Sequence, residues 1–216
     1  MVMSVEPAVA AAWQSFQNQM QLTDEQVDKF QRYYTLLIAW NERMNLTTIT
    51  QPEQIIAYHF QDSLMVGNYV NLSTIGSIAD IGSGAGFPGL PLKICYPQLT
   101  TYIIEVSHKR LQFLATVIKT LGLRNVNLID FDWRTFLRKT QFPIDLFCAR
   151  ASLQPEELIR MFKPACPYKS AQLIYWAASA WRPTQCIVPF VEKEVSYVVG
   201  NKKRKFVFLH KPAITT

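Results

Sequence analysis

Hydrophobic residues follow two different spacings along the chain. Up to about residue 72 they recur at steps of three and four, a spacing typical of amphipathic helices. The clearest run contains Val27, Phe30, Tyr34, Leu37 and Ile38. It follows Thr23-Asp-Glu-Gln26, a capping box whose side chains bind free backbone N–H groups at a helix start. A second helix is predicted from Pro52 to Val70, so we expect residues 1–72 to form an N-terminal helical cap.

From Ser77 onward, short apolar runs alternate with helical segments. The predicted strands are "SIADI", "LTTYIIEV", "VNLID", "IDLFCARA" and "AQLIYWAAS", and the predicted helices are "FPGLPLKICYP", "SHKRLQFLATVIKTLGL", "WRTFLRK" and "QPEELIRMFKPAC". This alternation predicts βαβ units and a mostly parallel sheet. "VSYVVG" and "KFVFLH" are predicted to form an antiparallel edge hairpin around a basic turn, "NKKRK". The expected fold is α/β, with a doubly wound sheet over residues 73–216.

A glycine-rich loop, "GSGAGFPG", joins the first predicted strand to the first helix of that second part. Ligands of open parallel sheets bind at the carboxyl ends of the strands, where this loop lies. Gly82, Gly84 and Gly86 allow close backbone approach or positive φ. Gly84 to Gly89 also matches G-x-G-x-x-G, a weak signal for a dinucleotide, whereas no Lys-Ser/Thr pair follows to bind a nucleoside triphosphate. The loop alone therefore leaves the ligand open.

Two acidic residues at strand ends separate the possible ligands. Asp80 ends the first strand, where a carboxylate would repel a pyrophosphate but accept hydrogen bonds from the ammonium of a methionine group. Glu105 ends the second strand and suits ribose hydroxyls, which NAD and S-adenosylmethionine share. Asp80 therefore favours S-adenosylmethionine. The structural alternatives are an Asp80 that caps loop N–H groups and a Glu105 that is a solvated strand end.

Charge and cysteine content restrict the partners and the compartment. The 216 residues are 49% hydrophobic, an ordinary globular composition, and carry a net charge of +6. This charge favours a polyanionic partner such as nucleic acid, although it is also compatible with a protein that is merely soluble. Four widely spaced cysteines lack C-x-x-C pairs and nearby histidines, so we expect reduced thiols and no metal site. The N-terminus lacks a basic region before its alanine run, and no apolar run approaches the roughly 20 residues of a membrane-spanning helix. The expected location is the cytoplasm.

Five strings in order identify a family that the chain resembles. They are "WNERMNLT", "HFQDSL", "DIGSGAGFPGLPL", "KRLQFL" and "ARA", between about residues 25 and 180. They resemble the glucose-inhibited division protein B family of bacterial 16S rRNA guanine-N7 methyltransferases. The resemblance implies a Rossmann-like methyltransferase domain with an N-terminal helical cap. It also implies transfer of a methyl group from S-adenosylmethionine, which leaves S-adenosylhomocysteine, to one guanine of the 530-loop in the decoding-site region. The substrate would be 16S rRNA or the 30S subunit, and the enzyme a monomer.

The resemblance assigns roles to residues at the strand ends. Gly82 and Phe87 are similar to loop contacts of the cofactor, Glu105 to the ribose acid, and Trp133 and Arg134 to residues along the adenine. Arg150 resembles an arginine at the cofactor and substrate end, and it is the candidate for catalysis by positioning. With Asp80 and Gly84 from the loop, these residues form the expected cofactor site. The alternatives are a packed aromatic at Trp133, a core residue at Phe87 and a structural salt bridge at Arg150.

Aromatic, histidine and cationic residues are candidates for contact with RNA. Trp40 and Trp133 are candidates for stacking on a base splayed out of its loop. The further candidates are His59, Asp62, Lys109, Arg110, Lys202, Lys203 and Arg204. His59 and Asp62 lie one helical turn apart, so a contact between their side chains is the alternative to a place at the substrate cleft. For Lys202 to Arg204, a solvated hairpin turn explains the charge almost as well.

The chemistry of guanine N7 requires little from the protein beyond alignment. N7 has an exposed lone pair and no proton to remove, so attack on a sulfonium methyl group is an in-line displacement without a general base. The sequence contains three histidines and no convincing Ser-His or Cys-His nucleophile arrangement, which is consistent with such a reaction.

Two positions depart from the family pattern. Ala149 stands where the family has serine in "SRA", and Ala178-Ser179 stands where it has a Lys-Gly pair. If that lysine holds RNA or the target base, its loss would reduce activity. An RNA-binding or ribosome-assembly factor with weakened catalysis is therefore an alternative function. An NAD-dependent oxidoreductase is disfavoured by Asp80 and by the lack of a candidate hydride-transfer site.

Overall fold

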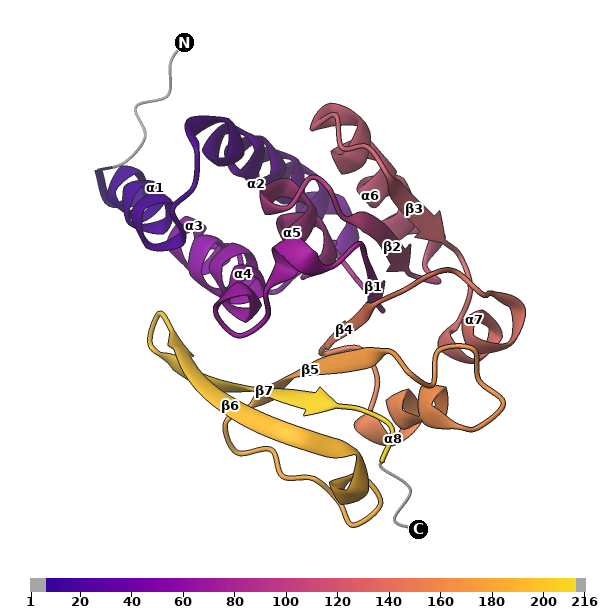
Figure 1. Cartoon of the computed structure of the whole chain (residues 1–216). Helices are drawn as coiled ribbons and strands as arrows, with labels where there is room; N and C mark the ends of the chain where they lie inside the picture. The colour runs from indigo at the N-terminus through magenta and orange to yellow at the C-terminus, as the bar shows by residue number, and fades with distance from the viewer. Residues whose placement is uncertain (1–6, 213–216) are drawn as a thin grey trace.

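A seven-stranded sheet forms the centre of the computed structural model, which describes residues 7–212 (Figure 1). The strands are β1 (Ser77–Ile81), β2 (Thr100–Ile104), β3 (Val126–Ile129), β4 (Leu146–Arg150), β5 (Gln172–Ala178), β6 (Val191–Val199) and β7 (Lys202–Leu209). Their order is β3-β2-β1-β4-β5-β7-β6. The first five strands pair in parallel, and β7 pairs antiparallel with both β5 and β6. The predicted parallel sheet with an antiparallel edge hairpin is confirmed.

Side chains of each central strand alternate between two hydrophobic cores. In β1, Ile78 packs into one core, whereas Ala79 and Ile81 pack into the other. All five residues of β1 are buried, as expected for a parallel strand covered by helices on both faces. The sheet is therefore doubly wound, and its strands are held on both faces by apolar packing.

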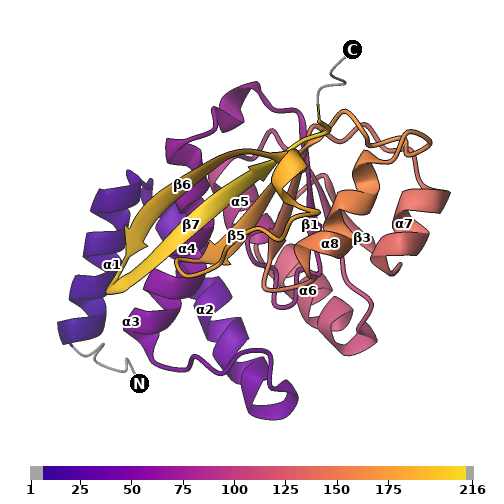
Figure 2. The same ribbon diagram turned by 90° about the horizontal axis from the view of Figure 1, so that it is seen from below.

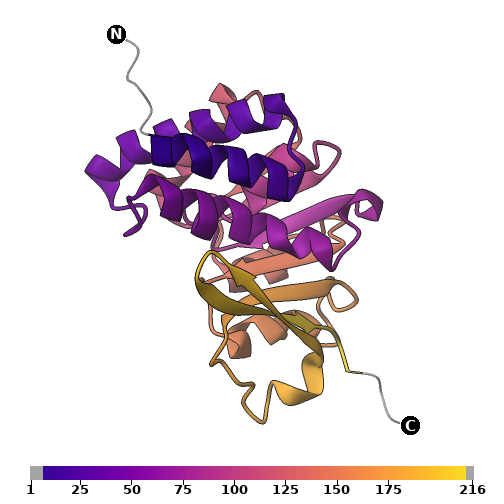
Figure 3. The same cartoon turned by 90° about the vertical axis from the view of Figure 1, so that its left-hand side faces the viewer.

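The N-terminal helices cover one face of the sheet (Figure 3). These are α1 (Pro7–Met20), α2 (Asp24–Met44), α3 (Pro52–Ile55) and α4 (Asp62–Leu64), and α5 (Gly89–Cys95) and α6 (His108–Thr120) share their core. The predicted capping box is confirmed, because Thr23 Oγ1 accepts from Gln26 N at 3.2 Å and Gln26 Oε1 accepts from Thr23 N at 2.9 Å. The division of the chain into an N-terminal cap (1–72) and a methyltransferase domain (73–216) stays a prediction. Residues 1–6 of the cap and 213–216 of the domain lie outside the described residues.

Two short helical segments cover the opposite face (Figure 2). One is α7 (Trp133–Lys139), and the other is α8 (Pro155–Leu158), which continues as the 3-10 helix η4 (Ile159–Phe162). The helix predicted for "QPEELIRMFKPAC" is thus shorter than expected and tightens after one turn. Smaller 3-10 turns lie at η3 (Leu72–Thr74) and η5 (Val188–Phe190).

The second predicted helix of the cap is present but is not α-helical throughout. Between α3 and α4 the backbone forms a π-helix, η1 (Ile56–Gln61), and after α4 it continues as a 3-10 helix, η2 (Met65–Asn68). Short π-helical segments are rare and often occur at functional sites. This one contains His59 and directly precedes Asp62, so two predicted site residues lie where the helix is widened.

The edge hairpin differs from the prediction at its tip. The turn consists of Gly200 and Asn201, whereas Lys202 to Lys205 begin β7 instead of forming a basic turn. Pairing with β5 places Lys205 opposite Ala177 and buries it to 5% exposure, where its Nζ donates to Glu194 Oε2 at 2.6 Å. The predicted basic turn is wrong because strand pairing, which a local sequence pattern does not show, determines which residues of the string face inward.

The cysteines and the helix lengths are the features that bear on the expectations from composition. Cys95, Cys148, Cys166 and Cys186 are free thiols in the structure. Between residues 7 and 212, no helix combines the length and apolar composition that crossing a bilayer requires. The N-terminal segment that was judged unlike a signal peptide begins outside the described residues.

We predict that Gly86→Ala destabilises the fold far more than Gly122→Ala. Both glycines have positive φ, +98° and +63°, where a Cβ costs about 1–2 kcal/mol. A Cβ at Gly86 would also overlap the Tyr33 hydroxyl and approach Leu90 Cδ1 to 2.8 Å, whereas Gly122 has open space around it. Urea denaturation should give a loss of about 3 kcal/mol or more for Gly86→Ala, and about 1–2 kcal/mol for the control. Equal losses would show that Tyr33 moves aside freely.

Candidate functional site

A cleft of about 290 Å³ lies at the carboxyl ends of β1, β2 and β4. In an open α/β sheet this is the expected ligand position, because the chain segments that follow β1 and β4 cross to opposite faces of the sheet and leave a crevice between them. The cleft is lined by Ile81, Gly82, Ile104, Glu105, Val106, Arg110, Phe131, Asp132, Trp133, Ala151, Ser152 and Leu153. Of the predicted cofactor residues, Gly82, Glu105 and Trp133 are therefore brought together in one cavity.

The glycine loop is held against β2 and against Ser152. Gly82 N donates to Ile104 O at 2.8 Å, and Gly82 has φ +63°. A Cβ at Gly82 would lie 2.5 Å from Ser152 Cβ, so only glycine allows this close approach. Gly84 N donates to Glu105 Oε2 at 2.9 Å. The loop is thus closely packed on one side and fixed by a strand-end carboxylate on the other.

Asp80 is completely buried beneath this loop. Its Oδ2 accepts from Gly89 N at 2.8 Å and from the Ser83 hydroxyl, so it holds both ends of the loop. Its Oδ1 is buried and has no hydrogen-bond partner among residues 7–212. Burial raises the pKa of Asp80 to about 6, although the bonds from Ser83 and Gly89 oppose this shift. Asp80 therefore fills the capping role that was its structural alternative and retains one unused acceptor.

Glu105 combines a structural role with a place in the cleft. Its Oε1 accepts from Ser107 N at 2.9 Å, and its Oε2 lies 3.6 Å from Arg110 Nη1. The side chain is only 3% exposed. It is not the solvated strand end of the alternative interpretation. Carboxylate oxygens have further lone pairs, so Glu105 is also able to accept hydrogen bonds from the hydroxyl groups of a ligand in the cleft.

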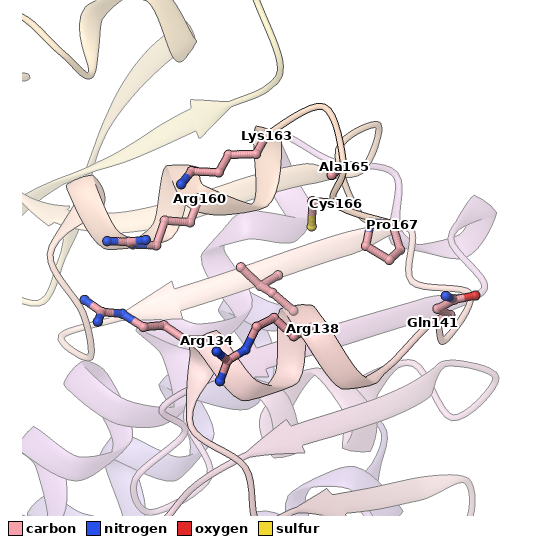
Figure 4. A pocket seen from close by; sticks show the side chains of 9 residues that line it. Arg134, Arg138, Gln141, Arg160, Lys163, Ala165, Cys166 and Pro167 are labelled. Atoms are coloured by element: carbon pink, nitrogen blue, oxygen red, sulfur yellow. The ribbon is translucent and has the colours of Figure 1, made fainter.

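Trp133 and Arg134 are adjacent in sequence but lie in different cavities. Trp133 is buried, lines the cleft and donates from Nε1 to Glu157 O at 3.1 Å. The side chain of Arg134 is 62% exposed and forms a bidentate pair with Glu157 at 2.6 and 2.9 Å. It lines a second groove, together with Arg138, Arg160 and Lys163 (Figure 4). The expectation that the Arg134 side chain lies along the adenine does not agree with this placement.

Arg150 is the centre of a buried charge cluster. Its Nη1 lies 3.0 Å from Asp62 Oδ2 and donates to Tyr58 O at 3.2 Å. Asp62 also accepts from Tyr197 Oη at 2.7 Å, and Arg204 Nε lies 3.4 Å from its Oδ1 as an ion pair without hydrogen-bond geometry. The carboxylate is 1% exposed. This burial contradicts the predicted contact between Asp62 and RNA, because Arg150, Tyr197 and Arg204 enclose the carboxylate.

His59 is held in one tautomer above the glycine loop. Its ring stacks on Phe87 with centroids 4.6 Å apart and planes 7° apart. Nδ1 lies 3.3 Å from Arg150 Nη2, which can only donate, so the proton resides on Nε2, 2.8 Å from Thr47 Oγ1. Burial and the cationic Arg150 lower the pKa of His59 to about 3. His59 is therefore neutral, and Arg150 connects it to Asp62 in place of a direct contact.

Phe87 lies in the core between the cap and the loop. It is 5% exposed, and Tyr33 stacks on it with centroids 5.5 Å apart. Arg150 Cζ lies 5.2 Å from the centre of the Phe87 ring. Phe87 is absent from the residues that line the described cleft. A direct contact between Phe87 and the cofactor stays a prediction.

The other RNA candidates are distributed over several elements. Lys109, Lys202 and Lys203 are exposed, and Arg110 is 46% exposed at the cleft. Trp40 packs on Phe113 with centroids 5.7 Å apart, whereas Lys202 Nζ lies 4.0 Å from the centre of the Tyr58 ring. The Arg204 side chain is 27% exposed and belongs to the Asp62 cluster. These candidates therefore come from α2, α6 and β7.

The departure from the family at Ala178 lies beside two arginines. Ala178 ends β5 and is paired with Arg204 on β7, while Trp176, two residues earlier, is paired with Arg150 on β4. Paired residues and residues two apart share one face of a sheet. The missing lysine would therefore lie on the face that carries Arg150 and Arg204. Ala149, the other departure, is completely buried in β4.

Several cleft residues were not predicted as site residues, among them Val106, Ala151 and Ser152. Val106 is 58% exposed at the cleft, Ala151 has φ +51°, and Ser152 Oγ is buried without a partner among the described residues. They directly follow Glu105 and Arg150, so their position after a strand end was the available signal. Their residue types carry no signal of a binding site. In the described part of the chain, no group of histidine, cysteine or carboxylate side chains is arranged to hold a metal ion.

Comparison with known proteins gives consistent matches. The family model GidB, rRNA small subunit methyltransferase G, matches residues 26–185. A ribosomal RNA small subunit methyltransferase G of Listeria innocua is 34% identical over 191 residues, which are 88% of this chain and 79% of the relative. A protein of the same name from Lachnoclostridium phytofermentans is 35% identical over 187 residues, 82% of this chain and 77% of the relative.

Solved structures confirm the fold at low sequence identity. M. capricolum TrmK in complex with S-adenosyl-homocysteine has a TM-score of 0.54 and 14% identity, covering 69% of this chain and 67% of its own. A mutant of MtNAS in complex with S-adenosylmethionine has a TM-score of 0.54 and 18% identity, covering 95% of this chain and 78% of its own. The expected Rossmann-like arrangement is confirmed.

We predict that Asp62→Asn strongly destabilises the protein. The substitution leaves Arg150 and Arg204 without their buried counter-charge, and breaking a buried pair costs about 3–5 kcal/mol. Asp28→Asn is the matched control, because Asp28 forms an exposed i,i+4 pair with Arg32. Urea denaturation should show a large loss for Asp62→Asn and no resolvable change for Asp28→Asn. Similar small changes would mean that the Asp62 cluster is solvated.

Proposed function

We propose that this chain, which belongs to the GidB family of rRNA small subunit methyltransferases G, methylates N7 of one guanine in 16S rRNA. Family membership makes the chain an S-adenosylmethionine-dependent rRNA methyltransferase. The observation that carries the proposal is the extent of the family match, because residues 26–185 include every residue that lines the cleft. The proposed guanine lies in the 530-loop of the decoding-site region.

The cleft fits S-adenosylmethionine in its chemistry. Trp133, Ile104 and Val106 offer an apolar surface for the adenine, and Glu105 offers acceptors for ribose hydroxyls. Asp80 Oδ1 is buried and has no hydrogen-bond partner among the residues that the structure describes, and we assign the ammonium of the methionine group to it. A pyrophosphate at the same loop would face this carboxylate, which disfavours NAD. When bound, S-adenosylmethionine supplies an electrophilic methyl group, and the protein supplies alignment.

Arg150 is the residue we assign to hold the target base. Its guanidinium is fixed by Asp62, Tyr58 O and His59, and its side chain remains 13% exposed beside the loop. In this position it is able to donate to guanine O6, an acceptor next to N7, and leave the N7 lone pair free. His59 stays neutral and therefore adds no competing charge or proton at this point.

The partner and the setting of the reaction are part of the same proposal. The enzyme acts as a monomer in the cytoplasm, with 16S rRNA, free or within the 30S subunit, as its substrate. Ala178 supports the alternative of an RNA-binding or assembly factor with weakened catalysis. Arg204, the residue paired with Ala178, supports activity instead, because it places a cation on the same face of the sheet.

Methyl transfer is the direct test of this function. The purified protein is incubated with labelled S-adenosylmethionine and either 30S subunits or 16S rRNA from a strain that lacks the modification. We expect one labelled N7-methylguanosine in the 530-loop, and the two substrates show which form is preferred. RNA binding without methyl transfer would favour the assembly factor. Calorimetry that detects NAD binding and no S-adenosylhomocysteine binding would exclude the methyltransferase.

The raised pKa of Asp80 predicts a pH dependence of cofactor binding. Below a pH of about 6, Asp80 is increasingly protonated, so the ammonium of S-adenosylhomocysteine loses its counter-charge. We expect its affinity to fall by up to about tenfold for each pH unit below 6 and to be constant above pH 7. Calorimetry from pH 5 to pH 8 measures this change.

The control is 5′-methylthioadenosine, which keeps the adenosine and lacks the amino-acid group. Its affinity should not change over the same pH range. Identical pH profiles for both ligands would assign the titration to another group and remove the proposed role of Asp80.

A further inference from the structure

A second groove, of about 470 Å³, lies between α7 and the segment formed by α8 and η4. It is on the sheet face opposite the N-terminal helices, and four cationic side chains line it (Figure 4). They are Arg134, Arg138, Arg160 and Lys163. The groove is open, and Leu137 and Cys166 are among its apolar residues.

The groove carries an excess of positive charge. Glu157 neutralises part of it, because its carboxylate binds Arg134 at 2.6 Å and Arg160 Nε at 2.9 Å. Within residues 7–212, Arg138 and Lys163 form no ion pair. One carboxylate is therefore shared by two of four cations, and the other two are free to bind an external anion.

We propose that this groove, which we name the α7–η4 groove, binds the phosphate backbone of the rRNA substrate. The inference rests on the proposed function, since it assigns a docking surface for the same RNA. The groove and the cleft have a common wall, because Trp133 lines the cleft, Arg134 lines the groove, and both donate to Glu157. The groove is therefore next to the cleft in which the cofactor is proposed to bind.

The arrangement of the cations suits a polyanion better than one small anion. Arg134 and Arg138 are one turn apart on α7, about 6 Å along the helix axis, and Arg160 and Lys163 form a second row on the facing segment. Arg134 and Arg160 are 62% and 40% exposed. Exposed cations in two rows neutralise successive phosphates, and planar guanidinium groups match phosphate oxygens in pairs.

Glu157 orients two of these guanidinium groups before RNA arrives. Arg134 uses Nε and Nη2 for the carboxylate, and Arg160 uses Nε. Each arginine has five N–H donors, so each keeps donors for a phosphate. Fixing these long side chains in advance reduces the conformational entropy that RNA binding would otherwise cost.

The other basic string of the chain is less available. Arg204 is paired with Asp62, and Lys205 is buried against Glu194. Lys202 lies over the Tyr58 ring. Lys203 is exposed and has no such contact among the described residues, but it is a single cation, whereas the α7–η4 groove brings four together.

The test compares two double variants that remove the same charge. Arg138→Gln/Lys163→Gln acts on the groove, and Lys119→Gln/Arg124→Gln removes exposed cations near the end of α6. Binding to in vitro transcribed 16S rRNA and to 30S subunits is measured between 50 and 200 mM salt, and S-adenosylhomocysteine binding checks that the cofactor cleft is intact. We expect the groove variant to bind RNA about tenfold more weakly at low salt, with a salt slope reduced by about 1 for each lost phosphate contact.

The control variant should keep the affinity and the salt slope of the unmodified protein. Equal RNA affinities for the two double variants would overturn the proposal. Because RNA affinity is measured without methyl transfer, a failure of the proposed activity is distinguishable from a failure of this docking surface.

Discussion

The carboxylate of Asp62 is almost completely removed from water, and a buried charge is stable only where opposite charges and hydrogen-bond donors reach it. These partners come from distant parts of the chain: Arg150 from β4, Tyr197 from β6 and Arg204 from β7. The hairpin, the sheet and the widened helix must therefore assemble together around one charge. The position of Arg150 beside the glycine loop is a result of this constraint, because Asp62 sets where its guanidinium lies.

Most of the fold could be predicted because its signals are local. The capping box before α2 and the alternation of short apolar strands with helices are contained within single elements. The hairpin tip and the π-helix η1 were not predicted, because they depend on contacts between elements. Lys205 is buried because of its pairing with β5, and a lysine-rich string taken alone indicates exposure.

In the candidate site, too, local signals predicted some residues correctly, and contacts between elements decided the rest. Gly82 and Glu105 were identified because residues at the ends of parallel strands meet at one edge of a sheet, and both line the cleft. Arg134 was assigned by its place next to Trp133, but neighbouring residues of a helix point in different directions, and its side chain enters the other groove. Asp62 was recognised as a site residue and given the wrong role, because its burial follows only from the tertiary packing of β6 and β7.

The tip of the β6–β7 hairpin restricts how the length of this chain can vary. Hairpin tips normally accept inserted residues, because they project into water. Here Asn201 accepts from the Tyr58 hydroxyl, and a Cβ at Gly200 would lie 2.9 Å from the Tyr58 ring. Tyr58 directly precedes His59, so an inserted residue at the tip would disturb the backbone that positions the site. Extra residues would be accommodated more easily in the connection between β5 and β6, where Ser179, Ala180 and Gln185 are exposed.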